Sequence, residues 1–249
     1  MASERSSPAS PPPVSEAESY SDTWFATFLD SIHPRQTEHE IAFLTRLLPL
    51  PRFARLVDLC CGSGRHALPL AECGYRVVGI DANTKAIAVA REAAGERVQY
   101  IHADMRDLRD MPTADAVICL WQSFGYYDEE TNADVIRQVA GRLDAGGRFL
   151  LDIYNRDHFA AREGSRTFRR AGETVTQTSR LADKRWRVEL RYGDGGVSDV
   201  FDWHLYTCDE IEAVGRACGL EVLRSCASYD ETLVPDPSRA RMQILFEKP

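Results

Sequence analysis

Two glycines and an aspartate in the first half of the chain have the types and the spacing of a ligand-binding turn. Gly62 and Gly64 follow an apolar run, "LVDLC", and precede a stretch with helical periodicity. Glycine lacks a Cβ, so it permits a tight turn and lets the backbone approach a ligand closely. Asp81 ends the next apolar run, nineteen residues after Gly62, where a carboxylate can accept hydrogen bonds from both hydroxyls of a ribose. The spacing predicts a cradle for an adenosine-bearing cofactor.

Two further carboxylates favour one class of cofactor over another. With Ala67, the glycines also satisfy the G-x-G-x-x-G/A pattern of a nicotinamide dinucleotide site, so an NAD(P)-dependent oxidoreductase is one alternative. Asp58 lies four residues before Gly62, where a carboxylate would oppose a pyrophosphate and attract an ammonium group. Asp104 follows a third apolar run, where it can accept a hydrogen bond from an adenine amino group. We therefore expect a cofactor with adenosine at one end and a positive charge at the other.

Two later clusters of aromatic and polar residues supply candidates for contacts to a second substrate. "LWQSFGYY" follows a fourth apolar run, and "DIYNRDHF" ends a fifth. In a parallel sheet, ligands bind outside the carboxyl ends of the strands, so both clusters are expected at the site. We predict Phe124, Tyr126 and His158 as catalytic candidates. The predicted substrate-binding residues are Phe124, Tyr127, Tyr154, Asn155, Arg156 and, in a later run, His204.

The elements that must position these residues alternate between strand and helix. Strands are expected at 53–60, 75–80, 97–103, 114–121 and 148–154, and helices at 65–73, 84–94 and 132–143. Asn83 is the expected N-cap of the second of these helices. Strands and helices in this order form βαβ units with right-handed crossovers, which place helices on both faces of a parallel sheet. The pattern predicts a doubly wound α/β fold.

The pattern changes after about residue 165. Residues 165–206 are rich in β-formers and turn signals, which predicts antiparallel hairpins inserted into the α/β fold. A helix follows, with Thr207 and Glu210 as a capping box and Gly219 at its end, and then two final strands. At the other end of the chain, residues 20–50 are predicted to be helical, up to Pro49 and Pro51.

Composition excludes several classes of protein. The formal net charge of −8 argues against a general nucleic-acid binder, and no apolar run reaches the length of a membrane helix. Residues 1–19 are rich in Ser, Pro and Ala, which predicts a disordered tail and not a secretory signal. The seven cysteines include no C-x-x-C pair, so we expect a reducing cytoplasm, no disulfide framework and no metal site. The sequence leaves open whether the protein forms a homo-oligomer.

The motifs together resemble those of the class I S-adenosylmethionine-dependent methyltransferases. "VDLCCGSGR", "GIDAN", "ADMRD", "LWQSFGYY" and "LDAGGRFLLDIYNRD" match the successive motifs of that family between about residues 55 and 155. The resemblance implies a mostly parallel seven-stranded sheet in the order 3-2-1-4-5-7-6, with the last strand antiparallel. It also implies that residues 20–249 form the methyltransferase domain, with residues 20–50 as a helical lid and residues 165–206 capping the substrate.

The same resemblance assigns the cofactor contacts. Asp58 and the backbone of Cys60, Cys61, Gly62 and Gly64 would hold the methionine end of S-adenosylmethionine, whose demethylated product is S-adenosylhomocysteine. Asp81, with Ala82 beside it, would bind the ribose. The adenine would lie against Asp104 and Met105, and Leu120 would help to place the sulfonium. From the lid, Tyr20 and Trp24 would close over the cofactor.

The implied reaction is a direct displacement that moves a methyl group to a small-molecule acceptor, such as a secondary metabolite. Such a reaction depends mainly on aligning the acceptor behind the methyl group, and an amine acceptor needs only to arrive unprotonated. We therefore favour N-methylation. The alternatives are an O- or C-methyltransferase with a His or Tyr base, and an S-adenosylmethionine-binding module without turnover.

One charge pattern stands apart from these motifs. Between Arg162 and Arg191 the chain carries nine basic residues and four acidic ones. Either this segment attracts an anionic substrate, or its charges form a solvated face. The sequence alone leaves both open.

Overall fold

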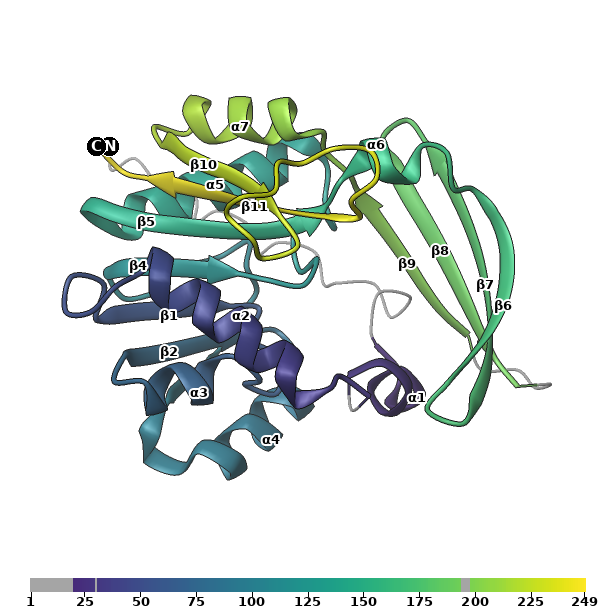
Figure 1. Ribbon diagram of the computed structural model, residues 1–249. Coiled ribbons are helices and arrows are strands. Elements are labelled where there is room, and N and C mark those ends of the chain that lie inside the picture. Colours follow the sequence, from purple (N-terminus) through teal and green to yellow (C-terminus); the bar gives the residue numbers. More distant parts are fainter. Residues whose placement is uncertain (1–19, 30, 194–197) are drawn as a thin grey trace, which may run out of the picture.

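The centre of the molecule is a seven-stranded sheet. The structure, a computed structural model, describes residues 20–29, 31–193 and 198–249, so the predicted tail at 1–19 lies outside the described residues. The order of the strands is β10-β11-β5-β4-β1-β2-β3 (Figure 1). Neighbouring strands from β3 to β5 are parallel, and β11 is antiparallel to both β5 and β10. The predicted fold class and strand order are confirmed. In chain order the strands are β1 Arg55–Leu59, β2 Arg76–Asp81, β3 Gln99–His102, β4 Ala114–Cys119, β5 Leu143–Tyr154, β10 Glu221–Ala227 and β11 Arg241–Glu247.

Helices cover both faces of this sheet, because alternate residues of each strand are buried on opposite sides. Leu56 of β1 packs with residues of α2 (Pro34–Leu47), α3 (Ala67–Glu72) and α4 (Thr84–Ala94). Its neighbour Val57 belongs to the core beneath α5 (Glu129–Arg142) and α7 (Cys208–Ala217). The chain is therefore doubly wound, and the carboxyl ends of β1, β2 and β4 are left uncovered by these helices.

Local capping fixes where the helices begin. The Asn83 side chain accepts a hydrogen bond from the Ala86 amide, and the capping box of Thr207 and Glu210 forms, as predicted. The helix predicted at 132–143 begins earlier, at Glu129. Asp128 caps it by accepting from the Thr131 amide, and acidic residues in the first turn favour the helix dipole.

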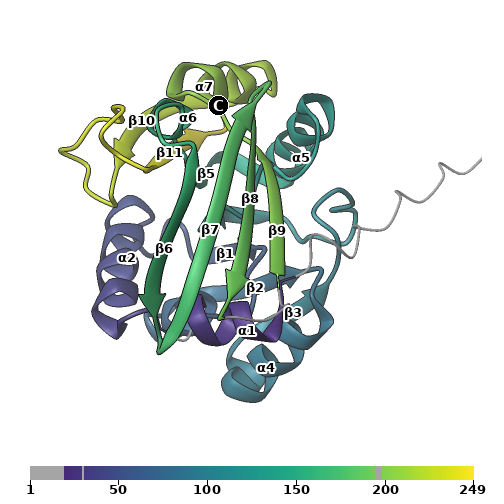
Figure 2. The ribbon, with the colours of Figure 1, turned by 90° about the vertical axis from the view of Figure 1, so that its right-hand side faces the viewer.

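A second, four-stranded sheet faces the carboxyl edge of the first. It consists of β6 (Gly164–Arg170), β7 (Glu173–Ala182), β8 (Arg185–Tyr192) and β9 (Ser198–His204), all antiparallel in this order (Figure 2). Its inner face buries a core of its own, which includes Trp186, Phe201 and Trp203. The short helix α6 (Arg156–Phe159) leads into it from β5. This sheet forms the predicted β insertion.

The N-terminal segment (residues 20–29) lies against the second sheet. It forms one α-helical turn, α1 (Asp22–Trp24), followed by a π-helical turn, Phe25–Leu29, within the stretch that the sequence predicts to be helical. Trp24 stacks on Phe28 with ring centroids 5.8 Å apart, and Tyr20 packs on Phe201 at 4.9 Å. Aromatic packing against the second sheet thus fixes this segment.

The described residues contain no helix suited to a membrane and no side-chain cluster suited to a metal ion. None of the helices there combines the length and apolar character needed to cross a membrane. Over the same residues, no three His, Cys, Asp or Glu side chains gather as a metal site would require.

Candidate active site

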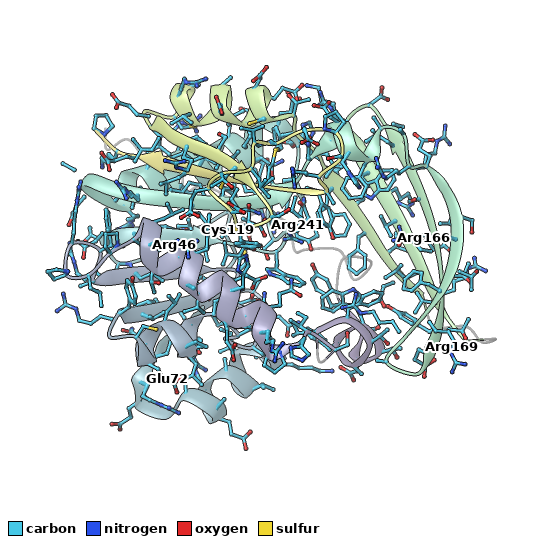
Figure 3. The ribbon with its side chains drawn as sticks, in the orientation of Figure 1. Arg46, Glu72, Cys119, Arg166, Arg169 and Arg241 are labelled. Carbon is cyan, nitrogen blue, oxygen red and sulfur yellow. The ribbon has the colours of Figure 1, made fainter. Side chains whose placement is uncertain are left out.

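A cavity of about 1060 Å³ lies between the two sheets. At one end it is lined by residues at the carboxyl ends of β1, β2 and β4, among them Asp58, Asp81 and Leu120. At the other end it is lined by the inner face of the second sheet, including Trp186 and Trp203. Figure 3 shows the side chains that project from both sheets into the region between them. The volume is in the range of pockets that hold small molecules and cofactors.

The turn after β1 forms the floor at the first end. Cys60, Gly62 and Gly64 all have positive φ angles, of 61°, 54° and 82°. A Cβ added to Gly64 would overlap the Tyr100 hydroxyl, whereas a Cβ added to Gly62 would meet no atom within 4 Å. Gly64 is therefore required by packing, and Gly62 borders open space with its backbone accessible to a ligand. Cys61 and Cys60 line the cavity beside it.

Asp58 presents an unpaired carboxylate oxygen at this end. The side chain is 2 % exposed and lines the cavity, yet Oδ2 has no hydrogen-bond partner. Burial and the nearby charge of Asp81 raise the pKa of Asp58 to about 7. A buried carboxylate oxygen without a partner is costly, and a cationic ligand in the cavity would compensate for it.

Arg65 presents a matching unpaired donor, and sequence reasoning missed it. Its Nη1 donates to Glu40 at 2.7 Å and to Thr37 at 2.8 Å, and its guanidinium lies over the Trp121 ring at 4.4 Å. The buried Nη2 has no partner, and the residue lines the cavity. The available signal was an arginine directly after the glycine turn.

These two groups fit the amino-acid end of the expected cofactor. A methionine moiety carries an ammonium group and a carboxylate on one carbon. Asp58 Oδ2 is the acceptor that the ammonium needs, and Arg65 Nη2 is a donor for the carboxylate. Two unpaired buried atoms of opposite type in the cavity lining thus match the zwitterionic methionine end of the cofactor that the family resemblance implies.

Some of the other residues predicted to bind the cofactor line the cavity, and some do not. Asp81 lines the cavity, but both its oxygens already accept backbone hydrogen bonds, from Gly62 and Asn83, and burial raises its pKa. Leu120 lines the cavity, and its carbonyl accepts from the Ser123 hydroxyl at 2.8 Å. Gly64, Ala82, Asp104 and Met105 lie outside the lining.

Asp104 and Met105 lie on the flank of the cofactor end. The Met105 sulfur is 3.9 Å from Cys60 Sγ, which connects it to the turn after β1. The Asp104 carboxylate pairs with Arg106, with Oδ2 2.6 Å from Nη2. Although burial opposes it, this pairing keeps the pKa of Asp104 low. A contact from Asp104 to adenine stays a prediction.

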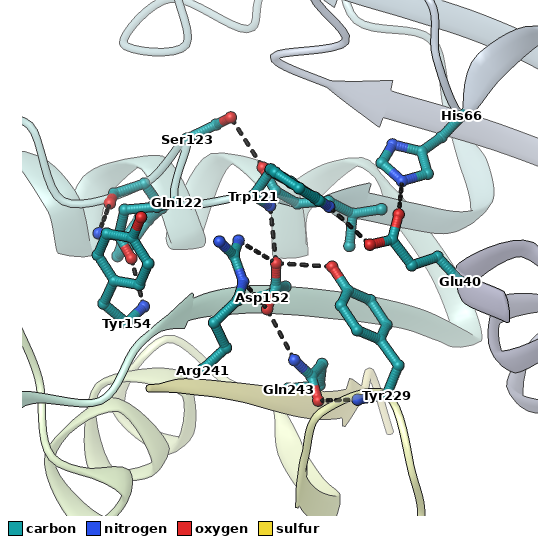
Figure 4. A network of polar contacts seen from close by, with 12 residues as sticks. Glu40, His66, Trp121, Gln122, Ser123, Asp152, Tyr154, Tyr229, Arg241 and Gln243 are labelled. Atoms are coloured by element: carbon teal, nitrogen blue, oxygen red, sulfur yellow. Dashed lines mark hydrogen bonds and ion pairs between the residues drawn. The ribbon is translucent and has the colours of Figure 1, made fainter. Parts of the chain in front are cut away.

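The turn after β4 also lines the cavity, through Trp121, Gln122 and Ser123. Trp121 and Gln122 both have φ near 60°, which is rare for residues with a side chain. Their backbone is held by Asp152, which is fully buried and accepts from the Trp121 amide at 2.7 Å (Figure 4). Asp152 also accepts hydrogen bonds from Tyr229, Arg241 and Gln243. This network holds the strained turn in place.

Two predicted acceptor-side residues reach the cavity. Tyr154 and His158 line it, with Tyr154 packed on Trp203 at 5.8 Å between ring centroids. His158 Nδ1 lies 3.1 Å from the Pro237 carbonyl, so this nitrogen donates and Nε2 is the acceptor. Burial and the charge of Arg162 lower the pKa of His158 below its usual value.

The other predicted acceptor-side residues lie outside the lining. Phe124 is 1 % exposed and packs on Tyr206 in the core. Asn155 caps α6 and Arg156 pairs with Glu210. The ring of His204 packs against Tyr206, and Tyr127 O accepts from Arg185. Tyr126 is hydrogen-bonded to Tyr20, which does line the cavity, and burial raises the pKa of both phenols.

Asp199 anchors the N-terminal segment to the second sheet. This carboxylate is 3 % exposed and accepts from the Ser21 amide and the Ser21 hydroxyl, each at 2.8 Å. Tyr192 donates to it from the adjacent strand at 2.6 Å. Tyr20 and Trp24, directly beside this anchor, line the cavity. The segment therefore forms one wall of the site.

We expect Asp199→Ala to loosen this wall. Loss of the bonds to Ser21 should raise hydrogen–deuterium exchange in residues 20–29, and should raise the KM for S-adenosylmethionine by about 3- to 10-fold, as for one or two lost hydrogen bonds. Tyr192→Phe is the control, because it removes one bond to Asp199 and keeps both from Ser21. Equal exchange in Asp199→Ala and the wild type would contradict the assignment.

Comparisons with known proteins agree with this site. The profile of a family described as "Methyltransferase domain" matches residues 56–147. The cypemycin N-terminal methyltransferase of a Streptomyces species is 30% identical over 200 residues, which cover 76% of this chain and 82% of that protein. A Streptomyces fradiae enzyme, dTDP-3-amino-3,6-dideoxy-alpha-D-glucopyranose N,N-dimethyltransferase, is 28% identical over 69% of this chain and 72% of its own.

Solved structures share the fold. An amino pentose methyltransferase from Micromonospora echinaspora, solved with S-adenosylmethionine bound, has a TM-score of 0.73 and 22% identity over 92% of this chain and 98% of its own. The CcbJ methyltransferase of Streptomyces caelestis has a TM-score of 0.76 and 18% identity over 88% and 92%. With the glycine turn, the seven-stranded order and the unpaired oxygen of Asp58 and nitrogen of Arg65, the family profile and the cypemycin relative show that the chain belongs to the class I S-adenosylmethionine-dependent methyltransferases.

Proposed function

We propose that this enzyme transfers the methyl group of S-adenosylmethionine to a nitrogen atom of a small-molecule amine. The observation that carries the proposal is the continuity of the cavity, which joins Asp58 and Arg65 at one end to an aromatic compartment at the other. Among the relatives, the Streptomyces fradiae enzyme is named as an N,N-dimethyltransferase of an amino sugar nucleotide, and the cypemycin enzyme is named as an N-terminal methyltransferase.

The chain's own residues would hold the cofactor at the first end. Asp58 would bind the ammonium, Arg65 the carboxylate and Asp81 the ribose, and the accessible backbone at Gly62 would contribute to the same end of the site. The bound cofactor supplies a methyl group on a sulfonium, which needs no further activation. What the protein adds is alignment of the acceptor, and positioning of this kind lowers reaction barriers by roughly 7–11 kcal/mol in favourable cases.

The aromatic compartment favours an amine. Trp24, Tyr154, Trp186 and Trp203 line it, and their ring faces attract cations. An amine in water is largely protonated, so these rings would draw it in, and the nucleophile is the uncharged form that remains after its proton is lost to solvent. Tyr20, which lines the cavity, has its pKa raised by burial, so its phenol stays protonated at neutral pH and can orient the amine as a hydrogen-bonding group.

O-methylation is the second candidate, because His158 offers a base. His158 lines the cavity, and its Nε2 is the unprotonated nitrogen, since Nδ1 donates to Pro237. A neutral imidazole with a lowered pKa can take the proton of a hydroxyl acceptor. Under N-methylation of a free amine, this base is not required.

A labelling experiment tests the function and the atom. Incubation with methyl-labelled S-adenosylmethionine and a metabolite extract, followed by mass analysis, should give a labelled amine. His158→Ala should keep most of the rate with that amine, since the uncharged amine is itself the nucleophile. A labelled ether or ester whose formation falls by about 100-fold or more in His158→Ala would favour O-methylation instead. Cofactor binding without any labelled product would favour the binding module.

A further inference from the structure

The inner face of the second sheet changes from apolar to charged across its four strands. The register pairs Val188 with Phe201 and Trp186 with Trp203 at β8 and β9, next to the turn after β4. Going outward, Leu190 pairs with Gln177, and Gln177 pairs with Arg166 of β6. Because side chains alternate along a strand, the residues of β6 that share this inner face are Arg166, Phe168 and Arg170.

The two inward arginines of β6 are held in place by uncharged groups. Arg166 lies over the Phe168 ring at 5.3 Å and donates to the side-chain Oε1 of Gln177 at 2.9 Å. Arg170 lies over the Phe28 ring at 5.1 Å and donates to the Ser31 hydroxyl at 2.8 Å. Both line the cavity, together with Arg162 and Arg169. These contacts orient the two guanidinium groups and do not neutralise their positive charges.

The cavity has two kinds of arginine. At the cofactor end, Arg65 pairs with Glu40 at 2.7 Å and Arg241 pairs with Asp152 at 2.5 Å. At the β6 end, neither Arg166 nor Arg170 has a carboxylate within 4.0 Å to form an ion pair. This holds for the residues that the structure describes, 20–29, 31–193 and 198–249. Glu163 also lines this end, and it accepts from the Leu181 amide at 3.0 Å. The positive charge is concentrated here in a chain whose net charge is −8.

We propose that the acceptor carries an anionic oxygen group, a carboxylate or a phosphate, which Arg166 and Arg170 bind. This inference rests on the proposed function, since it describes the acceptor of the same site. The acceptor spans the cavity with its amine at the aromatic end near the cofactor, its apolar body on Trp186 and Phe201, and its anion at β6. Guanidinium groups bind both kinds of oxyanion in bidentate geometry. The basic segment from Arg162 is therefore a recognition surface on its inner face.

Three matched probes test this in the full-length protein saturated with S-adenosylhomocysteine. 1-Naphthyl phosphate, 1-naphthoate and 1-naphthol share one aromatic body and differ in charge, and quenching of tryptophan fluorescence reports binding at the aromatic wall. We expect at least one anion to bind about 10- to 100-fold more tightly than the naphthol, as for charge-assisted hydrogen bonds. Which anion binds more tightly separates a carboxylate from a phosphate.

Two double variants locate the anion site. Arg166→Gln with Arg170→Gln should bring the anion's affinity down to that of 1-naphthol. The control, Arg187→Gln with Arg191→Gln, removes two arginines from the same sheet whose side chains are 61% and 72% exposed and lie near Asp202 and Glu189. It should leave the preference intact. Equal binding of all three probes, no binding of any, or an equal loss in both double variants overturns the proposal.

The experiment distinguishes failure of the acceptor inference from failure of the proposed function. Saturation with S-adenosylhomocysteine is measured first by calorimetry, and failure of that step refutes the cofactor assignment alone. If the cofactor binds and the labelled amine forms, but the anion preference is missing, only the acceptor inference fails. Melting temperatures of both double variants are compared with the wild type, since exposed arginines change stability little.

Discussion

Asp58→Asn is expected to weaken the binding of S-adenosylmethionine by about 10- to 100-fold, the cost of one charge-assisted hydrogen bond. The reason is that Oδ2 of this buried carboxylate has no partner in the protein and lines the cofactor end of the cavity. Asparagine keeps the shape of the side chain and removes its charge. Isothermal titration calorimetry at pH 8 measures the change, and an unaltered affinity would refute the role of Asp58.

The same residue sets the pH dependence of binding. The pKa of Asp58 is about 7 in the free protein, so below that pH a proton must leave before the carboxylate can accept from an ammonium. Affinity should therefore rise with pH up to about 7 and then level off. In Asp58→Asn this rise should be absent. Asp134→Asn, which alters an exposed aspartate paired with Arg137 on α5, is the control and should keep the wild-type profile.

The ionisation of Asp58 should affect the stability of the cofactor-free protein in the opposite direction, lowering it as the pH rises. Because the folded-state pKa of Asp58 lies above the ordinary value of 3.8, the folded protein holds this proton more tightly than the unfolded chain does. That contribution to stability is present at low pH and is lost as the pH rises through about 7. Without cofactor at pH 8, Asp58→Asn should melt at a higher temperature than the wild type. A lower melting temperature would mean that Asp58 is already paired.

The fold followed from local patterns because each strand and helix carries its own periodicity. In β8, Trp186, Val188 and Leu190 alternate with charged residues, and the structure buries these apolar residues. Asp58 and Asp81 were predicted from their distance to a glycine turn, which is also local information. Both line the cavity, although what they bind there stays a prediction.

Residues that act through long-range pairs could not be found this way. Glu40 is 25 residues from Arg65 and 81 from Trp121, and Asp152 is 89 from Arg241. No local periodicity brings such positions together. Conversely, Asn155 follows a strand, as predicted, but does not line the cavity. Its amide oxygen instead caps the following helix by accepting from the Asp157 amide. An Asn before a helical turn is itself a capping signal.

Glu40 stabilises the cofactor end of the site through its hydrogen bonds. It is fully buried and accepts from Arg65 at 2.7 Å. It also accepts from His66 Nε2 at 2.8 Å and from Trp121 Nε1 at 2.9 Å (Figure 4). Burial alone would raise the pKa of Glu40, but the hydrogen bond from His66 and the charge of Arg65 lower it to about 2. The carboxylate thus joins α2 to the turns after β1 and β4.

Glu40→Gln is expected to destabilise the protein by about 3–5 kcal/mol, because removing one member of a buried ion pair leaves Arg65 without compensation. For a chain of this size that corresponds to a fall in melting temperature of roughly 6–20 °C. Glu231→Gln is the matched control: it breaks the exposed pair between Glu231 and Arg46, also on α2, and should cost about 0–1 kcal/mol.

Acid titration gives a second, independent readout of Glu40. Its folded-state pKa lies below the ordinary value of 4.5, so its contribution to stability is present above about pH 4.5 and is lost as the pH falls towards 2. The wild type should therefore lose stability steeply across that window, and Glu40→Gln should lose less, since glutamine does not titrate. Parallel acid curves for the two proteins would show that Glu40 is not the buried anion that holds Arg65 at the cavity wall.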